Sequence, residues 1–175
     1  MGNEKTTIAG IEIPSTDPVF LAIVTVHILL GTACVVIGAV AILSTKAPGR
    51  HPAYGTLYYW MMAAAVATAS ALSFMRWAAN YHLFILGVLT FAAVHVGREA
   101  RRRRWSNWAS IHIVGMGSSY IFLLTAFYVD NGKQLPLWKD LPPWTYWTLP
   151  ALIGVPLILW AILRHPVARR SRPAR

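Results

Sequence analysis

The sequence predicts an all-α integral membrane protein in which five transmembrane helices form a single bundle. The chain of 175 residues is 56% hydrophobic and only 13% charged, whereas soluble domains carry roughly 25% charged residues. Five long apolar runs follow one another along the chain, and most approach the ~20 residues that cross a bilayer. Their apolar residues are continuous rather than alternating, which favours helices over a transmembrane barrel.

The first three apolar runs follow an outer polar tail of residues 1–17. The first run, residues 18–44, begins directly after Asp17, and aspartate is a common N-cap of helices. A short basic connection leads to the second run, residues 53–75. The third run, residues 81–98, is the shortest, and we expect its terminal arginine to lengthen it by snorkelling toward the interface.

Two further runs complete the membrane domain, which covers residues 18–164. The fourth run, residues 106–129, follows a loop crowded with arginine, and the fifth run, residues 144–164, follows a loop rich in proline. A basic tail of residues 165–175 ends the chain. Both runs are long enough to span the hydrocarbon core as helices.

The distribution of basic residues predicts the sidedness of the chain. Arg98 and Arg101–Arg104 crowd the loop between the third and fourth spans, and short cytoplasmic loops collect Lys and Arg. With the N-terminus placed outside, twelve of the 16 Lys and Arg fall on the cytoplasmic side, and five of the six acidic residues fall outside. We therefore expect an outer N-terminus and a cytoplasmic C-terminus.

The net charge of +10 does not indicate nucleic-acid binding, because the charges lie in short loops between apolar runs. We expect Arg101–Arg104 and the C-terminal tail to contact anionic lipid headgroups instead. The single cysteine, Cys34, excludes an internal disulfide and the two-cysteine motif that attaches c-type haem. A membrane-protein partner or a second copy of this chain stays open.

Histidines are the candidate functional residues, because no carboxylate falls inside a predicted span and ionisable residues within a membrane point to function. His51, His95 and His112 fall within roughly two turns of the inner surface, given the rise of ~1.5 Å per residue. We therefore expect them as metal ligands. His27 lies on the order of 15 Å from His112, nearer the outer face. Imidazole binds several metals and haem iron, so haem b and a divalent transition metal both stay open.

The same residues also fit a purely structural role. Gly31 and Gly38 belong to a stripe of small residues that lets helices pack closely in lipid, and a buried histidine can simply bind a neighbouring carbonyl. Alternatively, Gly31 beside the first-span histidine, and Gly115 and Gly117 beside His112, leave room for a haem ring. Two functions are therefore open: a haem- or metal-binding redox protein, and a non-catalytic subunit of a larger membrane complex.

Three short motifs combine these histidines with glycine, methionine and tyrosine. The motif residues are His27, Gly31 and Gly38 in the first span, His51, Gly55 and Tyr58 in the second, and His112, Met116 and Tyr120 in the fourth. Together they resemble a family of bacterial integral membrane proteins of unknown function. The chain departs from the pattern at Pro52, Thr56 and Ser118, where arginine is expected, and at Gly115, where tryptophan is expected.

The resemblance implies a location in the bacterial inner membrane. It also favours His27, His51 and His112, together with Gly31, Tyr58 and Tyr120, as the residues around a cofactor. The family has no known activity. The resemblance therefore indicates which histidines to consider but implies no reaction.

Overall fold

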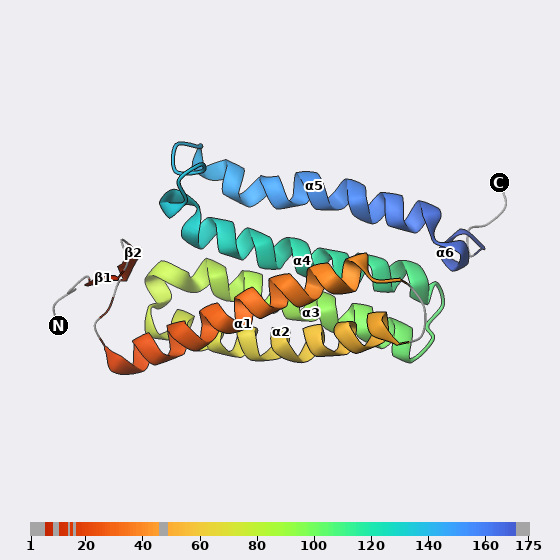
Figure 1. The fold of residues 1–175 in the computed structure, drawn as a ribbon, viewed down its shortest axis with the longest axis horizontal. Helices are drawn as coiled ribbons and strands as arrows, with labels where there is room; N and C mark the ends of the chain where they lie inside the picture. The colour runs from red at the N-terminus through yellow and green to blue at the C-terminus, as the bar shows by residue number, and fades with distance from the viewer. Residues whose placement is uncertain (1–5, 9–10, 14, 16, 46–48, 171–175) are drawn as a thin grey trace.

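The computed structural model describes residues 6–8, 11–13, 15, 17–45 and 49–170. Five long helices run up and down beside one another, as Figure 1 shows. A hairpin of two short strands precedes them, and a short helix follows. The bounds are β1 Thr6–Ile8, β2 Ile11–Ile13, α1 Pro18–Leu43, α2 Arg50–Met75, α3 Trp77–Arg102, α4 Trp108–Asn131, η1 Gly132–Gln134, α5 Pro143–Arg164 and α6 Pro166–Arg170.

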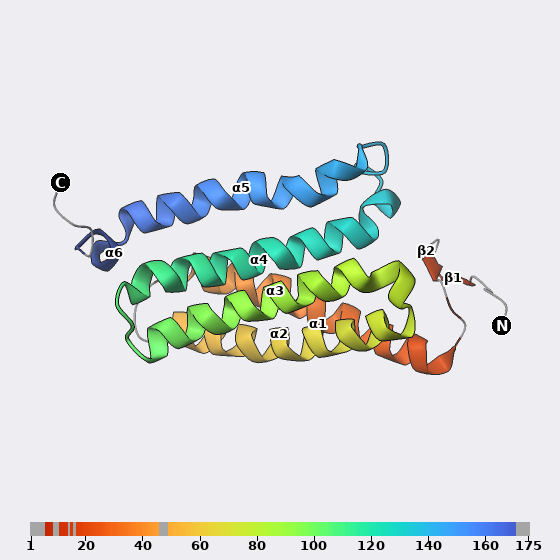
Figure 2. The ribbon, with the colours of Figure 1, turned by 180° about the vertical axis from the view of Figure 1, so that it is seen from behind.

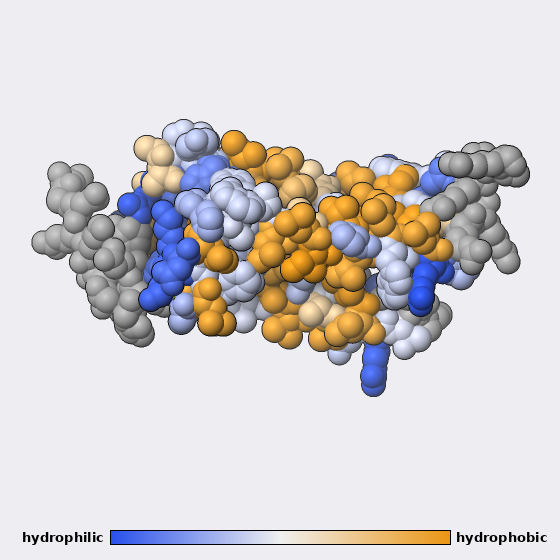
Figure 3. Space-filling view, turned by 90° about the horizontal axis from the view of Figure 1, so that it is seen from above, coloured by the Kyte–Doolittle hydropathy of each residue, from blue (hydrophilic) through white to orange (hydrophobic). Residues whose placement is uncertain are grey.

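The five long helices confirm the predicted helical class, since each is long and apolar enough to cross a membrane. In space-filling view, apolar residues cover the middle of the molecule and hydrophilic residues gather toward its two ends (Figure 3). This distribution is the one expected of a multi-pass membrane protein. The hairpin was not predicted within the polar tail; its strands are antiparallel, with Thr6 paired to Ile13, and β-branched residues favour that conformation.

The helix ends show how the sequence sets the boundaries. Asp17 caps α1 as predicted, and its side chain accepts a hydrogen bond of 2.8 Å from the Val19 amide. The third span is longer than predicted because Arg76 alone separates α2 from α3. The rings of Phe74 and Trp77 stack across this turn, with centroids 5.7 Å apart and planes 9° apart. The turn therefore needs no polar loop, and α3 starts four residues early.

The connections divide the molecule into two ends. One end carries residues 44, 45 and 49, the loop 103–107 and helix α6, and the other carries the Arg76 turn and the connection 132–142 (Figures 1 and 2). We call the first of these the basic end, because Arg101–Arg104 lie there.

The buried core lies among α1, α2, α3 and α4, while α5 lies at the edge beside α4 (Figures 1 and 2). One cluster of buried side chains joins the first three of these helices, and α4 adds side chains at its margin. The buried members are Cys34, Tyr58, Tyr59, Met62, Ala65 and Val94. The helices thus bury one another through a compact set of aromatic and small residues.

Glycines bring α3 and α4 into backbone contact. A methyl group added at Gly115 would lie 2.6 Å from the Cα of Gly97 and 2.7 Å from the carbonyl oxygen of Ala93. Small residues allow this approach in membranes, where van der Waals contact drives helix association. Gly97 and Gly115 therefore hold the two helices together at one level of the bundle.

Candidate functional site

The structure brings His51 and His112 together at the basic end. His51 lies in the first turn of α2 and His112 in the second turn of α4. Their ring centroids are 6.3 Å apart, and the ring planes are nearly perpendicular at 85°. The sequence predicts both residues near one surface, and the fold makes them neighbours.

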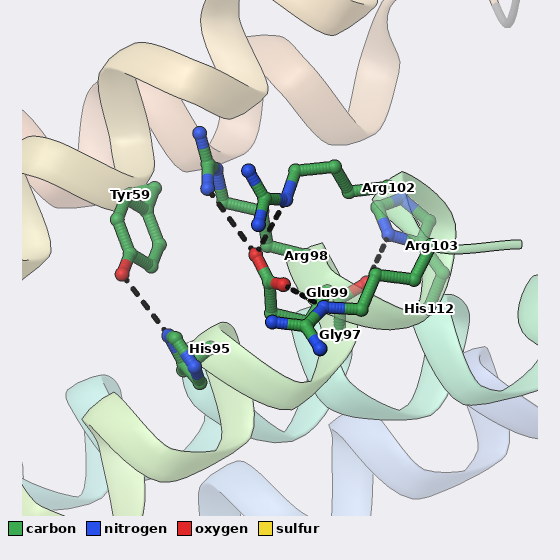
Figure 4. Close-up of polar contacts among 8 residues, drawn as sticks. All are labelled: Tyr59, His95, Gly97, Arg98, Glu99, Arg102, Arg103 and His112. Carbon is green, nitrogen blue, oxygen red and sulfur yellow. Dashed lines mark hydrogen bonds and ion pairs between the residues drawn. The ribbon is translucent and has the colours of Figure 1, made fainter. Parts of the chain in front are cut away.

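Each ring of this pair is oriented by a backbone carbonyl from another helix. The Nδ1 atom of His51 lies 2.9 Å from the carbonyl oxygen of Ala41 in α1. The Nδ1 atom of His112 lies 2.9 Å from the carbonyl oxygen of Gly97 in α3 (Figure 4). A carbonyl only accepts hydrogen bonds, so each Nδ1–H donates, and the lone pair of the neutral ring resides on Nε2. Histidines that bind metals are commonly held in this way.

His95, the third expected ligand, does not join the pair. It is exposed on α3, and its Nδ1 lies 3.1 Å from the hydroxyl oxygen of Tyr59 in α2 (Figure 4). Across the described residues, His, Cys, Asp and Glu form no group of three or more that could hold a metal ion. Among the described residues, the expected inner triplet is therefore reduced to the pair His51 and His112.

His27 occupies a separate level of the bundle. Its Nδ1 lies 3.1 Å from the carbonyl oxygen of Ala65 and 3.0 Å from the hydroxyl oxygen of Thr68, both in α2. Ala41, which contacts His51, is fourteen residues further along α1. The helical rise converts this spacing to about 20 Å. His27 therefore belongs to a different contact from the His51–His112 pair.

Contrary to the expectation from the sequence, the glycines beside His112 leave no space for a haem ring at their own positions. Gly115 packs against the backbone of Gly97, and a methyl group at Gly117 would lie 2.6 Å from the side chain of Ile158 in α5. Because α3 and α5 pack closely against α4, neighbouring atoms fill the space beside these glycines. Of the three glycines expected to leave room for a haem ring, only Gly31 on α1 has no atom within 4 Å of an added methyl group.

Tyr58 and Tyr120 fill the space beside Gly38 rather than lining an open site. A methyl group at Gly38 would lie 2.6 Å from the Tyr120 ring and 2.9 Å from the Tyr58 ring. The Tyr120 hydroxyl donates a 3.0 Å hydrogen bond to the carbonyl of Val35, and the Tyr58 hydroxyl lies 3.1 Å from that of Ser119. In this structure both tyrosines join α1, α2 and α4.

Glu99 was not among the site residues predicted from the sequence. It is only 6% exposed, and its carboxylate lies 2.7 Å from Nε of Arg103, 3.0 Å from Nε of Arg102 and 3.6 Å from Arg98 (Figure 4). The spacing of three and four residues from Glu99 to the two later arginines is typical of helical ion pairs and was visible in the sequence. Two of the four loop arginines therefore have an acidic partner within the protein.

No family model, curated protein or solved structure matches the chain. The resemblance to the bacterial membrane family therefore stays a prediction. The site is defined by its geometry: an oriented histidine pair that joins four helices, beside a buried carboxylate with three arginines.

Proposed function

We propose that this is a multi-pass protein of the bacterial inner membrane that binds a transition metal ion or haem iron at His51 and His112 and serves in electron transfer. The distance between the two rings is the observation that supports the proposal. Two imidazoles that bind one ion through nitrogen at ~2.0 Å place their ring centres roughly 5–6 Å apart. The observed 6.3 Å is close to that range.

The surroundings of the pair favour an ion that keeps open coordination positions. Two histidines leave two or more positions of a zinc, copper or iron ion for water or an anion. Arg101, one turn beyond Gly97 on α3, supplies positive charge on this side for such an anion. The packed glycines near His112 argue against a haem ring at those positions, and the absorption spectrum distinguishes the two cofactors.

The arginines also support the proposed sidedness. Arg98, Arg101–Arg104 and Arg164 all lie toward the basic end, and positive charges are retained on the cytoplasmic side during insertion. The N-terminus then lies outside, and the histidine pair faces the cytoplasmic side of the membrane. A metal there is accessible to soluble electron carriers in the cytoplasm.

The test is metal analysis and absorption spectroscopy of the protein purified in detergent. We expect either about one equivalent of a transition metal or a haem Soret band. His112→Ala should lower the content at least tenfold, because one of only two protein ligands is lost. His27→Ala is the matched control, since that ring is also held by a carbonyl, and it should leave the content unchanged.

Two results would refute this proposal. One is equal loss of metal from His27→Ala and His112→Ala, which would indicate general destabilisation. The other is a wild-type protein that binds no zinc, copper, iron or haem after reconstitution. Either result leaves the arginine-based orientation untouched, because that argument does not depend on a cofactor.

The second candidate function, a non-catalytic subunit of a membrane complex, is favoured by the same hydrogen bonds. His27 joins α1 to α2, His51 joins α2 to α1, and His112 joins α4 to α3. Each bond alone contributes to helix packing, at about 0.6 kcal/mol on average in membrane proteins. In that case the His27→Ala and His112→Ala variants lose similar thermal stability, and the purified wild type contains neither metal nor haem.

A further inference from the structure

His95 is a polar side chain on a surface that should face lipid. It is exposed on α3, seven residues before the helix ends at Arg102, which places it about 10 Å inside that end. Among the described residues, its one hydrogen bond joins Nδ1 to the Tyr59 hydroxyl. The other ring nitrogen, Nε2, is thus available to a ligand in a region where water is scarce. Polar groups in that environment are costly unless a partner satisfies them.

An open groove of about 300 Å³ lies next to this ring, between α2 and α3. Val66, Val88, Phe91 and Ala92 line it together with His95, so the imidazole is its polar group and the rest of the lining is apolar. The volume is at the lower end of the range for small-molecule sites. A ligand must therefore be compact, largely apolar and able to hydrogen-bond at one point.

Aromatic rings form one side of this region. The ring centroids of Phe91 and His95 are 6.0 Å apart and those of Tyr59 and Phe91 are 5.8 Å apart, with interplanar angles of 33° and 36°. Arg98 extends over the Tyr59 ring at 4.5 Å from its centroid. Tilted and offset ring arrangements of this kind are favourable contacts for a further planar ring.

We propose that this groove binds the headgroup of an isoprenoid quinone. A quinone has a planar apolar ring with carbonyl oxygens at opposite edges, and its isoprenoid tail stays in lipid on the open side of the groove. With the Tyr59 hydroxyl donating to Nδ1, the Nε2–H of His95 donates to a quinone carbonyl. With the proton on Nδ1 instead, Nε2 accepts from a quinol hydroxyl. One histidine thereby suits both redox forms of the ligand.

The position of the groove relates it to the histidine pair. Gly97, whose carbonyl orients His112, lies two residues beyond His95 on α3. The polar end of the groove at His95 therefore lies near the level of His112, whereas Val88, nine residues before Gly97 on α3, lies about 13 Å deeper in the bundle. Quinone binding itself does not rest on the proposed metal site, although an electron-transfer role for the bound quinone would.

The experiment is calorimetric titration of the full-length protein in detergent with a ubiquinone analogue that carries a decyl tail. We expect saturable binding of one molecule per chain. His95→Leu keeps the bulk of the side chain but removes the hydrogen bond, and it should weaken binding by about tenfold. Val88→Trp fills the groove and leaves His95 in place, and it should abolish binding.

Val114→Trp is the matched control for the filled groove. Val114 is 43% exposed and Val88 is 48% exposed, but Val114 lines a separate groove between α3 and α4. Its substitution should leave the affinity unchanged. The His112→Ala variant should keep quinone binding while it loses metal, so failure of this inference and failure of the proposed metal site are distinguishable.

Four results would overturn the quinone assignment. The first is wild-type protein that shows no saturable binding, and the second is unchanged affinity in Val88→Trp. The third is competition by short-chain phosphatidylglycerol at the same concentration as the quinone analogue, which would identify an ordinary lipid-binding groove. A dimer that Val88→Trp converts to a monomer would likewise replace the quinone by a second copy of this chain.

Discussion

Gly115→Ala tests the packing that positions His112. The added methyl group would lie 2.6 Å from the Cα of Gly97 and 2.7 Å from the Ala93 carbonyl oxygen. Both are backbone atoms, so no side-chain rotation relieves the contact. The helices α3 and α4 must separate by about 1 Å to restore ordinary van der Waals distances. The same separation lengthens the 2.9 Å hydrogen bond from His112 to the Gly97 carbonyl.

The expected cost combines two opposing effects. Overpacking of a well-packed interior costs about 1–3 kcal/mol, and the inflexible backbone places this contact toward the upper end. Replacing glycine by alanine in a helix returns up to about 1 kcal/mol. We therefore expect a net loss of about 1–2 kcal/mol in the free energy of unfolding. Gly31→Ala is the control, because its methyl group meets nothing within 4 Å.

The assay is the unfolding of both variants in mixed micelles of detergent and denaturant, followed by circular dichroism. Gly115→Ala should unfold at lower denaturant than wild type, and Gly31→Ala at an equal or slightly higher concentration. Gly115→Ala should also weaken metal binding at the proposed site, since it displaces the carbonyl that orients His112. Equal stability of the two variants would show that α3 and α4 do not approach as closely as described.

Three further predictions address sidedness, the loop arginines and a tyrosine contact. A fluorescent reporter that works only in the cytoplasm should be active at the C-terminus. A phosphatase that works only outside should be active when inserted at residues 132–142. The opposite pattern would reverse the orientation. Replacing Arg101–Arg104 by alanine should lower the fraction of molecules that insert in the correct orientation, because each charge contributes about 1 kcal/mol at the membrane surface. The metal content of the inserted molecules should not change. Normal insertion with loss of metal would identify the loop as part of the site. Tyr120→Phe keeps the ring over Gly38 but removes the hydrogen bond to the Val35 carbonyl. In the same unfolding assay it should lower the free energy of unfolding by about 0.6 kcal/mol. A loss of several kcal/mol would mean that the hydroxyl has a further partner.

Much of the fold could be predicted from the sequence because length and apolarity are properties of each segment alone. Four helices begin and end within a few residues of their predicted spans, and Asp17 caps α1 as expected. The exception, α3, extends beyond both predicted ends. Its extra residues are 77–80 and 99–102. The helix continues through them because of ring packing at the Arg76 turn and the Glu99 ion pairs. Neither contact affects the hydropathy of the segment, so the predicted span was too short.

The candidate site was predicted less completely. Depth along a helix follows from counting residues, so sequence analysis could place His51, His95 and His112 near one surface and His27 apart from them. It could not select the pair that meets, because contact depends on how each helix is rotated about its axis. A soluble helix reveals its inward face by one apolar stripe, whereas helices in lipid are apolar on every side.

The sequence by itself therefore determined the number of helices, their approximate limits and the concentration of arginine at one end. The tertiary structure decided which side chains meet. It turned His51 and His112 toward each other and His95 outward beside Tyr59. It also closed the glycine positions against neighbouring helices. The physical reason is that close packing between helices, rather than the apolarity of any one helix, sets their rotation and spacing in a membrane.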